Sequence, residues 1–171
     1  MAFGLRSPAF HALLLAGALA SVTPFAALAQ DAGLRFGGLN QDSSQPVEVT
    51  SESLSVDQAD NSALFTGNVV VIQGEMRLNA PRVRVEYGAN GEGIQKVIAY
   101  DDVLLVTPAE AAEGKHAVYT VSDSLLVMTD QVVLTQGAAV ITGDKLTANL
   151  NDSTGLMTGN VKTLFQPGAK Q

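Results

Sequence analysis

The sequence contains no cysteine and no tryptophan, and aromatic residues make up only 5% of it. Without cysteine there is no disulfide, so burial of apolar side chains and backbone pairing must stabilise the fold. Aromatic rings are the usual platforms for stacked ligands such as sugars, and few rings are present. The interior is therefore expected to be aliphatic, which suits either alkyl chains or a plain hydrophobic core.

Positive charge is also scarce, because 10 Lys and Arg residues stand against 17 Asp and Glu residues, for a formal net charge of −7. Proteins that bind nucleic acid neutralise its phosphates with clustered Lys and Arg side chains. The composition therefore argues against a nucleic-acid partner.

Residue types that carry catalysis are few. After the first 30 residues His116 is the one histidine, and the chain has neither cysteine nor a His-x-His spacing to accompany it. This favours a surface histidine over a metal ligand. The Asp101-Asp102 pair invites a metal or acid–base interpretation, but a role in a turn is favoured. The sequence thus predicts no catalytic site, no metal site and no cofactor, and a protein that is not an enzyme.

The first 29 residues are typical of a secretory signal peptide. Arg6 supplies the positive start, residues 9–20 are apolar, and Ala27-Leu28-Ala29 matches a cleavage site. A retained anchor is the alternative, but a spanning helix needs about 20 apolar residues, and Pro24 helps to interrupt this run. We expect cleavage after Ala29, which leaves 142 of the 171 residues and, with Arg6 removed, a net charge of −8. That length is typical of one domain.

From Val47 onward the chain shows the pattern of β-strands, with short apolar or alternating stretches separated by Gly, Asn, Asp or Pro. The pattern repeats: LSVDQADNSALFTGNV at 54–69 matches LTANLNDSTGLMTGNV at an offset of 92 residues. Asp101-Asp102-Val103 stands where Gly67-Asn68-Val69 stands in another copy. Repeats of about 30 residues indicate stacked units, none of which buries its apolar face alone.

Turn signals divide these units. Gln73-Gly74 and Gln136-Gly137 are expected between strands, since glycine adopts the positive φ of tight turns. Gly67 and Gly159 directly precede strand residues and are expected at bulges or bends. The longest loops are predicted over residues 88–93 and 108–114, with one helical turn as an option over residues 109–113.

The stretches TGNVVVIQG, MRLNAPRVRVEY, VLTQG and TGDKLTANL resemble the repeated motif of the OstA-like, LptA-type family of lipopolysaccharide-transport proteins. The resemblance covers residues 47–166. It implies an all-β, twisted antiparallel jelly-roll with a V-shaped aliphatic groove. One departure is Thr129-Asp130-Gln131, which replaces the TGN of the motif and leaves the local bend open.

The same resemblance implies a function. The groove would hold the acyl chains of lipopolysaccharide (lipid A) in the periplasm, and the protein would bridge the two membranes and deliver lipopolysaccharide to the outer membrane. Copies would associate head to tail, and the partners would be an LptC-like anchor at the inner membrane and an LptD-like assembly at the outer membrane. The expected organisation is a signal peptide over 1–29, a flexible segment over 30–46, the jelly-roll over 47–166 and a tail over 167–171.

Two sets of apolar and edge residues are the candidate contacts. Those expected to face the groove are Val56, Leu64, Val69, Val71, Leu78, Val83, Val85, Leu105, Leu125, Val132, Leu134 and Leu146. Those expected on edge strands, where an unclosed sheet seeks partners, are Val47, Val49, Val161, Thr163 and Phe165.

Arg77, Arg82 and Arg84 form, with Lys96, a basic cluster in an acidic chain. Because arginine matches phosphate with a fork of donors, a headgroup contact is one interpretation. A solvated outer face is the other, and the alternation with Leu78, Val83 and Val85 favours it. For the whole protein, the alternative to lipid transport is a structural or adhesive β-repeat protein with a filled core and no lipid ligand.

Overall fold

The computed structural model describes residues 34–35, 45–89 and 93–165. The predicted signal peptide, most of the predicted flexible segment and the tail lie outside these residues. The described part contains strands and no helix, which confirms the all-β prediction. The strands are Leu34–Arg35 (β1), Val47–Thr50 (β2), Ser53–Asp57 (β3), Ser62–Gln73 (β4), Met76–Tyr87 (β5), Ile94–Val106 (β6), Glu110–Thr120 (β7), Leu125–Gln136 (β8), Ala139–Asn149 (β9), Thr154–Thr158 (β10) and Lys162–Phe165 (β11).

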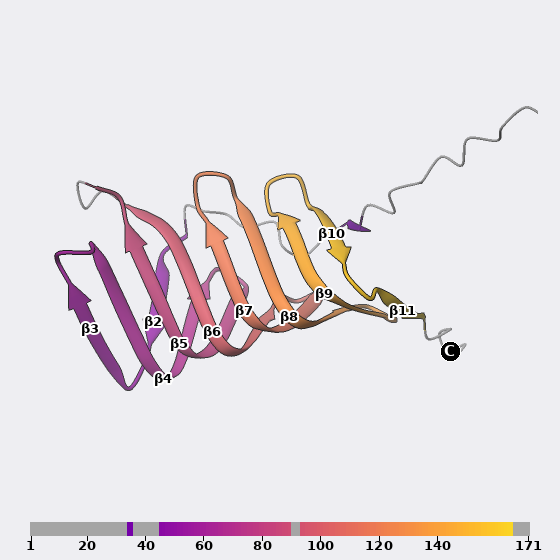
Figure 1. The fold of residues 1–171 in the computed structure, drawn as a ribbon, viewed down its shortest axis with the longest axis horizontal. Coiled ribbons are helices and arrows are strands. Elements are labelled where there is room, and N and C mark those ends of the chain that lie inside the picture. The colour runs from indigo at the N-terminus through magenta and orange to yellow at the C-terminus, as the bar shows by residue number, and fades with distance from the viewer. Residues whose placement is uncertain (1–33, 36–44, 90–92, 166–171) are drawn as a thin grey trace, which may run out of the picture. The chain divides into compact units, whose positions relative to one another are not determined.

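All strand pairs are antiparallel, and the sheet does not close on itself. Strands β4 to β10 pair in chain order, as successive hairpins (Figure 1). At one end β2 and β3 both pair with β4, and at the other β10 and β11 both pair with β9. Hairpin connections of this kind bring residues close in sequence together across the sheet.

A register break interrupts each pairing between β4 and β9. At these breaks the chain places pairs of residues with positive φ, a conformation that favours Gly, Asn and Asp. The pairs at these breaks are Gly67-Asn68 on β4, Asp101-Asp102 on β6 and Asp130-Gln131 on β8; a fourth pair, Gly159-Asn160, continues the line between β10 and β11, which both pair with β9. The structure thus confirms the predicted bends at Gly67 and Gly159, and it gives Asp101-Asp102 the same conformation. We call this line of breaks the corner.

The corner lets both halves of a long strand turn apolar side chains to the same interior. On one half the residues Val71, Leu78, Leu105, Ala112, Leu134 and Ile141 lie opposite one another from β4 to β9. On the other half the corresponding row is Phe65, Val83, Ala99, Ala117, Met128 and Leu146. Members of both rows belong to one hydrophobic cluster, so we call the face that carries them the inner face. Strands that bend at bulges are a known way to form such a core.

One predicted loop is wrong. Residues 110–114 belong to β7, so the turn after β6 is short, and residues 109–113 form no helical turn. The turn is closed by Thr107 N–H, which donates to the Glu110 carbonyl over 2.9 Å. Strand β5 ends at Tyr87 and β6 begins at Ile94, on either side of the loop predicted over residues 88–93, of which residues 90–92 lie outside the described part of the chain. Gly74 and Gly137 take φ values of 56° and 55°, as the Gln-Gly turns require.

Candidate binding face

The inner face is not equally buried along the sheet. Met128, Val132, Leu134 and Leu146, on β8 and β9, have no exposed surface. The apolar residues that pack against the core but stay partly exposed all lie on β2 to β7: Val49, Phe65, Val71, Met76, Leu78, Tyr87, Ile94, Val97 and Tyr119. The partly exposed apolar residues of the core cluster therefore belong to the strands β2 to β7.

Ten of the twelve groove candidates lie on the inner face. The register places the other two, Leu64 and Leu125, on the outer face: Leu64 lies opposite Arg84, and Leu125 lies opposite Asn149. Among the ten, Val71 and Leu78 are half-buried, whereas Val56 is 64% exposed on the edge strand β3. Whether any of them touches lipid stays a prediction.

Sequence reasoning missed several inner-face residues. Leu126 and Met128 belong to a continuous apolar run that begins at Leu125. Because every residue of the run is apolar, the sequence does not show which side chains point inward. Ala99, Ala112 and Ala117 are buried as well, but alanine is too small and too common on surfaces to mark a core position in the sequence. Alignment of the internal repeats offered one signal, because Phe65 and Met157 occupy the same position at the offset of 92 residues.

Exposed apolar side chains gather at the two ends of the sheet. Leu54 is 54% exposed, yet Leu146, its equivalent in the repeat, is fully buried. Val161 is 51% exposed, yet its equivalent Val69 is 1% exposed. Each of these two repeat positions is thus buried where neighbouring strands cover it and exposed at an end of the sheet. Solenoid-like folds normally end in a polar capping unit, and neither described end has one.

The edge candidates lie at these ends. Val47 and Val49 are on β2, and Thr163 and Phe165 are on β11; each of these strands has one pairing partner among the described residues. Val161 directly precedes β11. Strand β1 pairs with β10 through Leu34↔Gly155 and Arg35↔Thr154, so part of that edge is occupied by the same chain.

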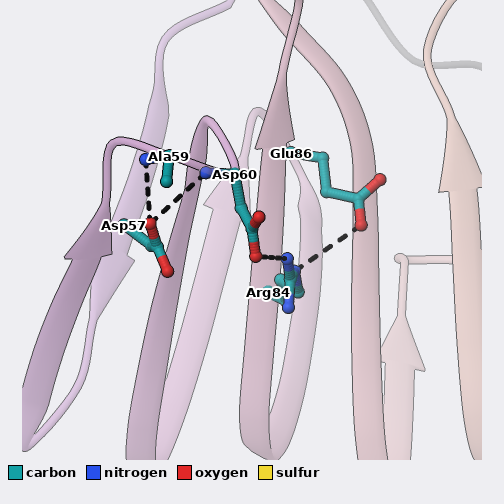
Figure 2. Close-up of polar contacts among 5 residues, drawn as sticks. All are labelled: Asp57, Ala59, Asp60, Arg84 and Glu86. Atoms are coloured by element: carbon teal, nitrogen blue, oxygen red, sulfur yellow. Dashed lines mark hydrogen bonds and ion pairs between the residues drawn. The ribbon is translucent and has the colours of Figure 1, made fainter.

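The three candidate phosphate ligands lie on the outer face. Arg84 lies between two carboxylates, 3.5 Å from Asp60 Oδ2 and 3.5 Å from Glu86 Oε1 (Figure 2). Arg82 pairs with Asp101 over 2.6 Å, and the Nε of Arg77 donates to Asn79 Oδ1. Acidic and amide groups of the chain itself thus surround the guanidinium groups. A phosphate contact by these residues stays a prediction.

The corner carries further polar contacts on the outside of the fold. Lys115 forms an ion pair with Asp102, and this hydrogen bond and the nearby negative charge raise the pKa of Lys115. His116 packs edge-on against Tyr100, with ring centroids 5.0 Å apart. Two hollows of about 330 and 360 Å³ lie along this corner, and both are lined in part by Asp102.

Within the described residues no group of three or more His, Cys, Asp or Glu side chains could hold a metal ion. Nor do the described ranges contain a helix that is long and apolar enough to cross a membrane. What the fold does bring together is a set of apolar side chains on the inner face and, at the ends of the described sheet, strands with one pairing partner.

An unclosed, bent antiparallel sheet with an apolar inner face defines the class of open β-jelly-rolls. Residues 48–154 match the family described as LptA/(LptD N-terminal domain) lipopolysaccharide transport protein. The match covers more than half of the chain, so the protein belongs to this family, as the sequence motifs predicted.

Individual relatives agree with this assignment. The chain is 32% identical to an uncharacterised protein of Rhizobium meliloti over 148 residues, which cover 82% of this chain and 80% of that protein. It is 31% identical to the lipopolysaccharide export system protein LptA of Escherichia coli over 113 residues, or 62% of this chain and 60% of that protein. The crystal structure of LptH of Pseudomonas aeruginosa, an LptA homologue described as a periplasmic transport component, has the same fold, with a TM-score of 0.65 at 20% identity over 72% of this chain and 96% of LptH.

Proposed function

We propose that this protein is a non-catalytic periplasmic carrier that holds the acyl chains of lipopolysaccharide on its inner face and bridges the inner and outer membranes. The family assignment supports lipopolysaccharide transport as the process. The observation that carries the binding proposal is the set of partly exposed apolar residues on the inner faces of β2 to β7. Covering apolar surface with acyl chains is favourable by about 25 cal/mol per Å².

The ends of the sheet support the second half of the proposal. Leu54 and Val161 leave uncovered the positions that the repeat buries elsewhere. A further sheet placed at either end would cover them and continue the inner face. We propose head-to-tail association of copies, with an LptC-like anchor at one end of the row and an LptD-like assembly at the other. Export by a signal peptide over residues 1–29 would place the protein in the periplasm.

One observation favours the alternative of a structural β-repeat protein with a filled core. On β8 and β9 the inner-face residues Met128, Val132, Leu134 and Leu146 are fully buried, so these side chains leave no apolar surface open to a ligand. The two proposals differ at β4 and β5, where the filled-core model gives Val71 and Leu78 no ligand.

Photo-crosslinking distinguishes the proposals with neighbouring residues of one strand. Val71 and Ile72 are both half-buried, and strand alternation places Val71 on the inner face and Ile72 on the outer face. A photoreactive residue at Val71 should capture purified lipopolysaccharide, and one at Ile72 should capture much less. Equal capture at both positions, or none at Val71 while the variant is folded, would contradict binding on the inner face.

A further inference from the structure

Glu110 is a charged residue on the otherwise apolar inner face. It is the first residue of β7, and alternation puts it on the same side as Ala112. Its relative exposure is 5%, whereas acidic side chains are almost never buried unless they are paired. Its position next to the apolar row of Leu105, Ala112 and Leu134 therefore requires an explanation.

Only one of the two carboxylate oxygens of Glu110 has a hydrogen-bond donor among the described residues. Gln136 Nε2, directly opposite on β8, donates to Oε1 over 2.6 Å. The Glu110 backbone is held by the tight turn at Thr107, whose Oγ1 accepts from Glu110 N–H over 3.2 Å. The second carboxylate oxygen, Oε2, is buried and has no hydrogen-bond donor within the described part of the chain. Buried polar atoms are normally hydrogen-bonded, because an unmade bond costs the desolvation of the group.

We propose that Oε2 of Glu110 accepts a hydrogen bond from the amide N–H that joins an acyl chain to the headgroup of a bound lipid. This inference rests on the proposed lipid-binding function and adds a polar subsite to it. Binding sites for amphiphiles are mostly apolar, with a few placed polar groups that fix orientation. Here Val71 and Leu78, the partly exposed members of the inner-face row, would hold the chain, and Glu110, nearer the hairpin end of the sheet, would fix the depth at which the chain stops.

An uncharged donor fits this position better than a charged one. A phosphate is an anion that is mostly deprotonated at neutral pH, so it would be repelled by the carboxylate. An ammonium group would have to leave water beside Leu105 and Leu134, which are 3% and 0% exposed. Oε1 of the carboxylate already accepts a hydrogen bond from the side-chain amide of Gln136. A second amide N–H would donate to Oε2 in the same way.

The test uses three synthetic amphiphiles of equal chain length. The first joins the chain to a neutral headgroup through an amide, the second joins it to the same headgroup through an ester, and the third is the alkylammonium. The parent protein should bind the amide about tenfold or more tightly than the ester, as expected for a hydrogen bond to a buried charged acceptor. Glu110→Gln, which replaces one oxygen by a donor, should abolish that preference.

A matched control and a second variant keep the test decisive. Glu113→Gln makes the same chemical change on the same strand at an exposed position, and it should keep the preference. If Glu110→Gln does not fold, Glu110→Asp withdraws the carboxylate by one methylene and should also lose the preference.

The outcomes separate this inference from the proposed function. Equal binding of amide and ester by the parent overturns the inference, with a buried water left as the partner of Oε2, and so does a preference for the ammonium that Glu110→Gln removes. In both cases lipid binding on the inner face still stands. If the parent binds neither these probes nor lipopolysaccharide, the proposed function itself is wrong.

Discussion

The side-chain amide of Asn160 donates a hydrogen bond to Asp144 Oδ2 over 2.8 Å, where the chain turns the corner between β10 and β11. At the offset of 92 residues Asn68 makes the same contact with Glu52. In both places the backbone N–H of the acidic residue also donates to the carbonyl of a glycine, Gly159 or Gly67. The internal repeat therefore encodes a specific corner, in which a positive-φ pair is held by the neighbouring strand.

The corner glycines should be less replaceable than the turn glycines. A Cβ added at Gly67 would lie 2.8 Å from Glu52 Cβ, whereas one added at Gly137 meets nothing within 4 Å. Both residues have positive φ. We expect Gly137→Ala to lower the free energy of unfolding by about 1 kcal/mol, and Gly67→Ala to lower it by about 2–4 kcal/mol because steric crowding is added. Urea unfolding of the two variants would measure this, and equal losses would contradict the corner contact.

The repeat pattern predicted the corner better than the residue types did. Thr129-Asp130-Gln131 departs from the TGN found at residues 66–68 and 158–160, so the motif alone does not predict its bend. Asp130 and Gln131 nevertheless adopt φ values of 67° and 61°, as the glycine-containing pairs do. A pairing partner on each side fixes the strand halves, so their geometry imposes the bend on residues that adopt it less readily than glycine.

Two features could not be predicted from the sequence. Residues 110–114 look like a loop because Ala and Glu have low β-propensity, but Ala112 lies between Leu105 and Leu134, where a small residue fits. The inward side of the run Leu125-Leu126-Val127-Met128 is ambiguous, since every residue is apolar. The pairing with neighbouring strands determines both the extent of β7 and the inward side of β8, and the local sequence does not specify that pairing.

The register of β8, which turns Leu126 inward and Leu125 outward, leads to a prediction about stability. Leu126 is 3% exposed and belongs to the core, whereas Leu125 lies half-buried on the outer face opposite Asn149. Leu126→Ala should lower the free energy of unfolding by about 2–5 kcal/mol, because it leaves a cavity in the core. Leu125→Ala should cost about 1 kcal/mol or less. Chemical denaturation of both variants tests the register, and a larger loss for Leu125→Ala would mean that β8 faces the other way.

The ion pair at the corner gives a pH prediction. The hydrogen bond from Lys115 to Asp102 raises the pKa of Lys115 above the ordinary lysine value. A raised lysine pKa stabilises the fold below the unfolded-state pKa, and this contribution is lost as the pH rises through the folded-state value. Asp102→Asn should therefore lower the pKa of Lys115, seen by side-chain NMR titration, and its stability difference from the parent should shrink at alkaline pH.

Asp130→Asn is the control for this prediction. Asp130 also has positive φ, and its carboxylate accepts a hydrogen bond from the Thr129 hydroxyl, with no effect of Asp130 on the pKa of Lys115. The Lys115 titration should stay unchanged in that variant. A similar change in both variants would indicate a general effect of surface charge, not a specific pair.

The open ends of the sheet give the last prediction, which concerns the symmetry of self-association. If copies associate head to tail, each contact joins the Leu54 end of one molecule to the Val161 end of another, and such a heterologous contact propagates without closing. A lysine at either position adds charge to an open edge, a device by which natural edge strands resist pairing. Leu54→Lys alone and Val161→Lys alone should each be monomeric in sedimentation at concentrations where the parent associates, since every contact needs both ends.

A mixture of the two variants should recover a single contact. The Leu54→Lys molecule keeps an intact Val161 end, and the Val161→Lys molecule keeps an intact Leu54 end, so the pair should form a dimer and nothing longer. In a two-fold symmetric contact each end would meet its own copy, and one of the two variants would associate as the parent does. Gln58→Lys adds the same charge in the exposed turn after β3 and should leave association unchanged. Because all three variants change solvent-exposed side chains, each should keep the thermal stability of the parent, and loss of association without loss of folding assigns the contact to the two ends of the sheet.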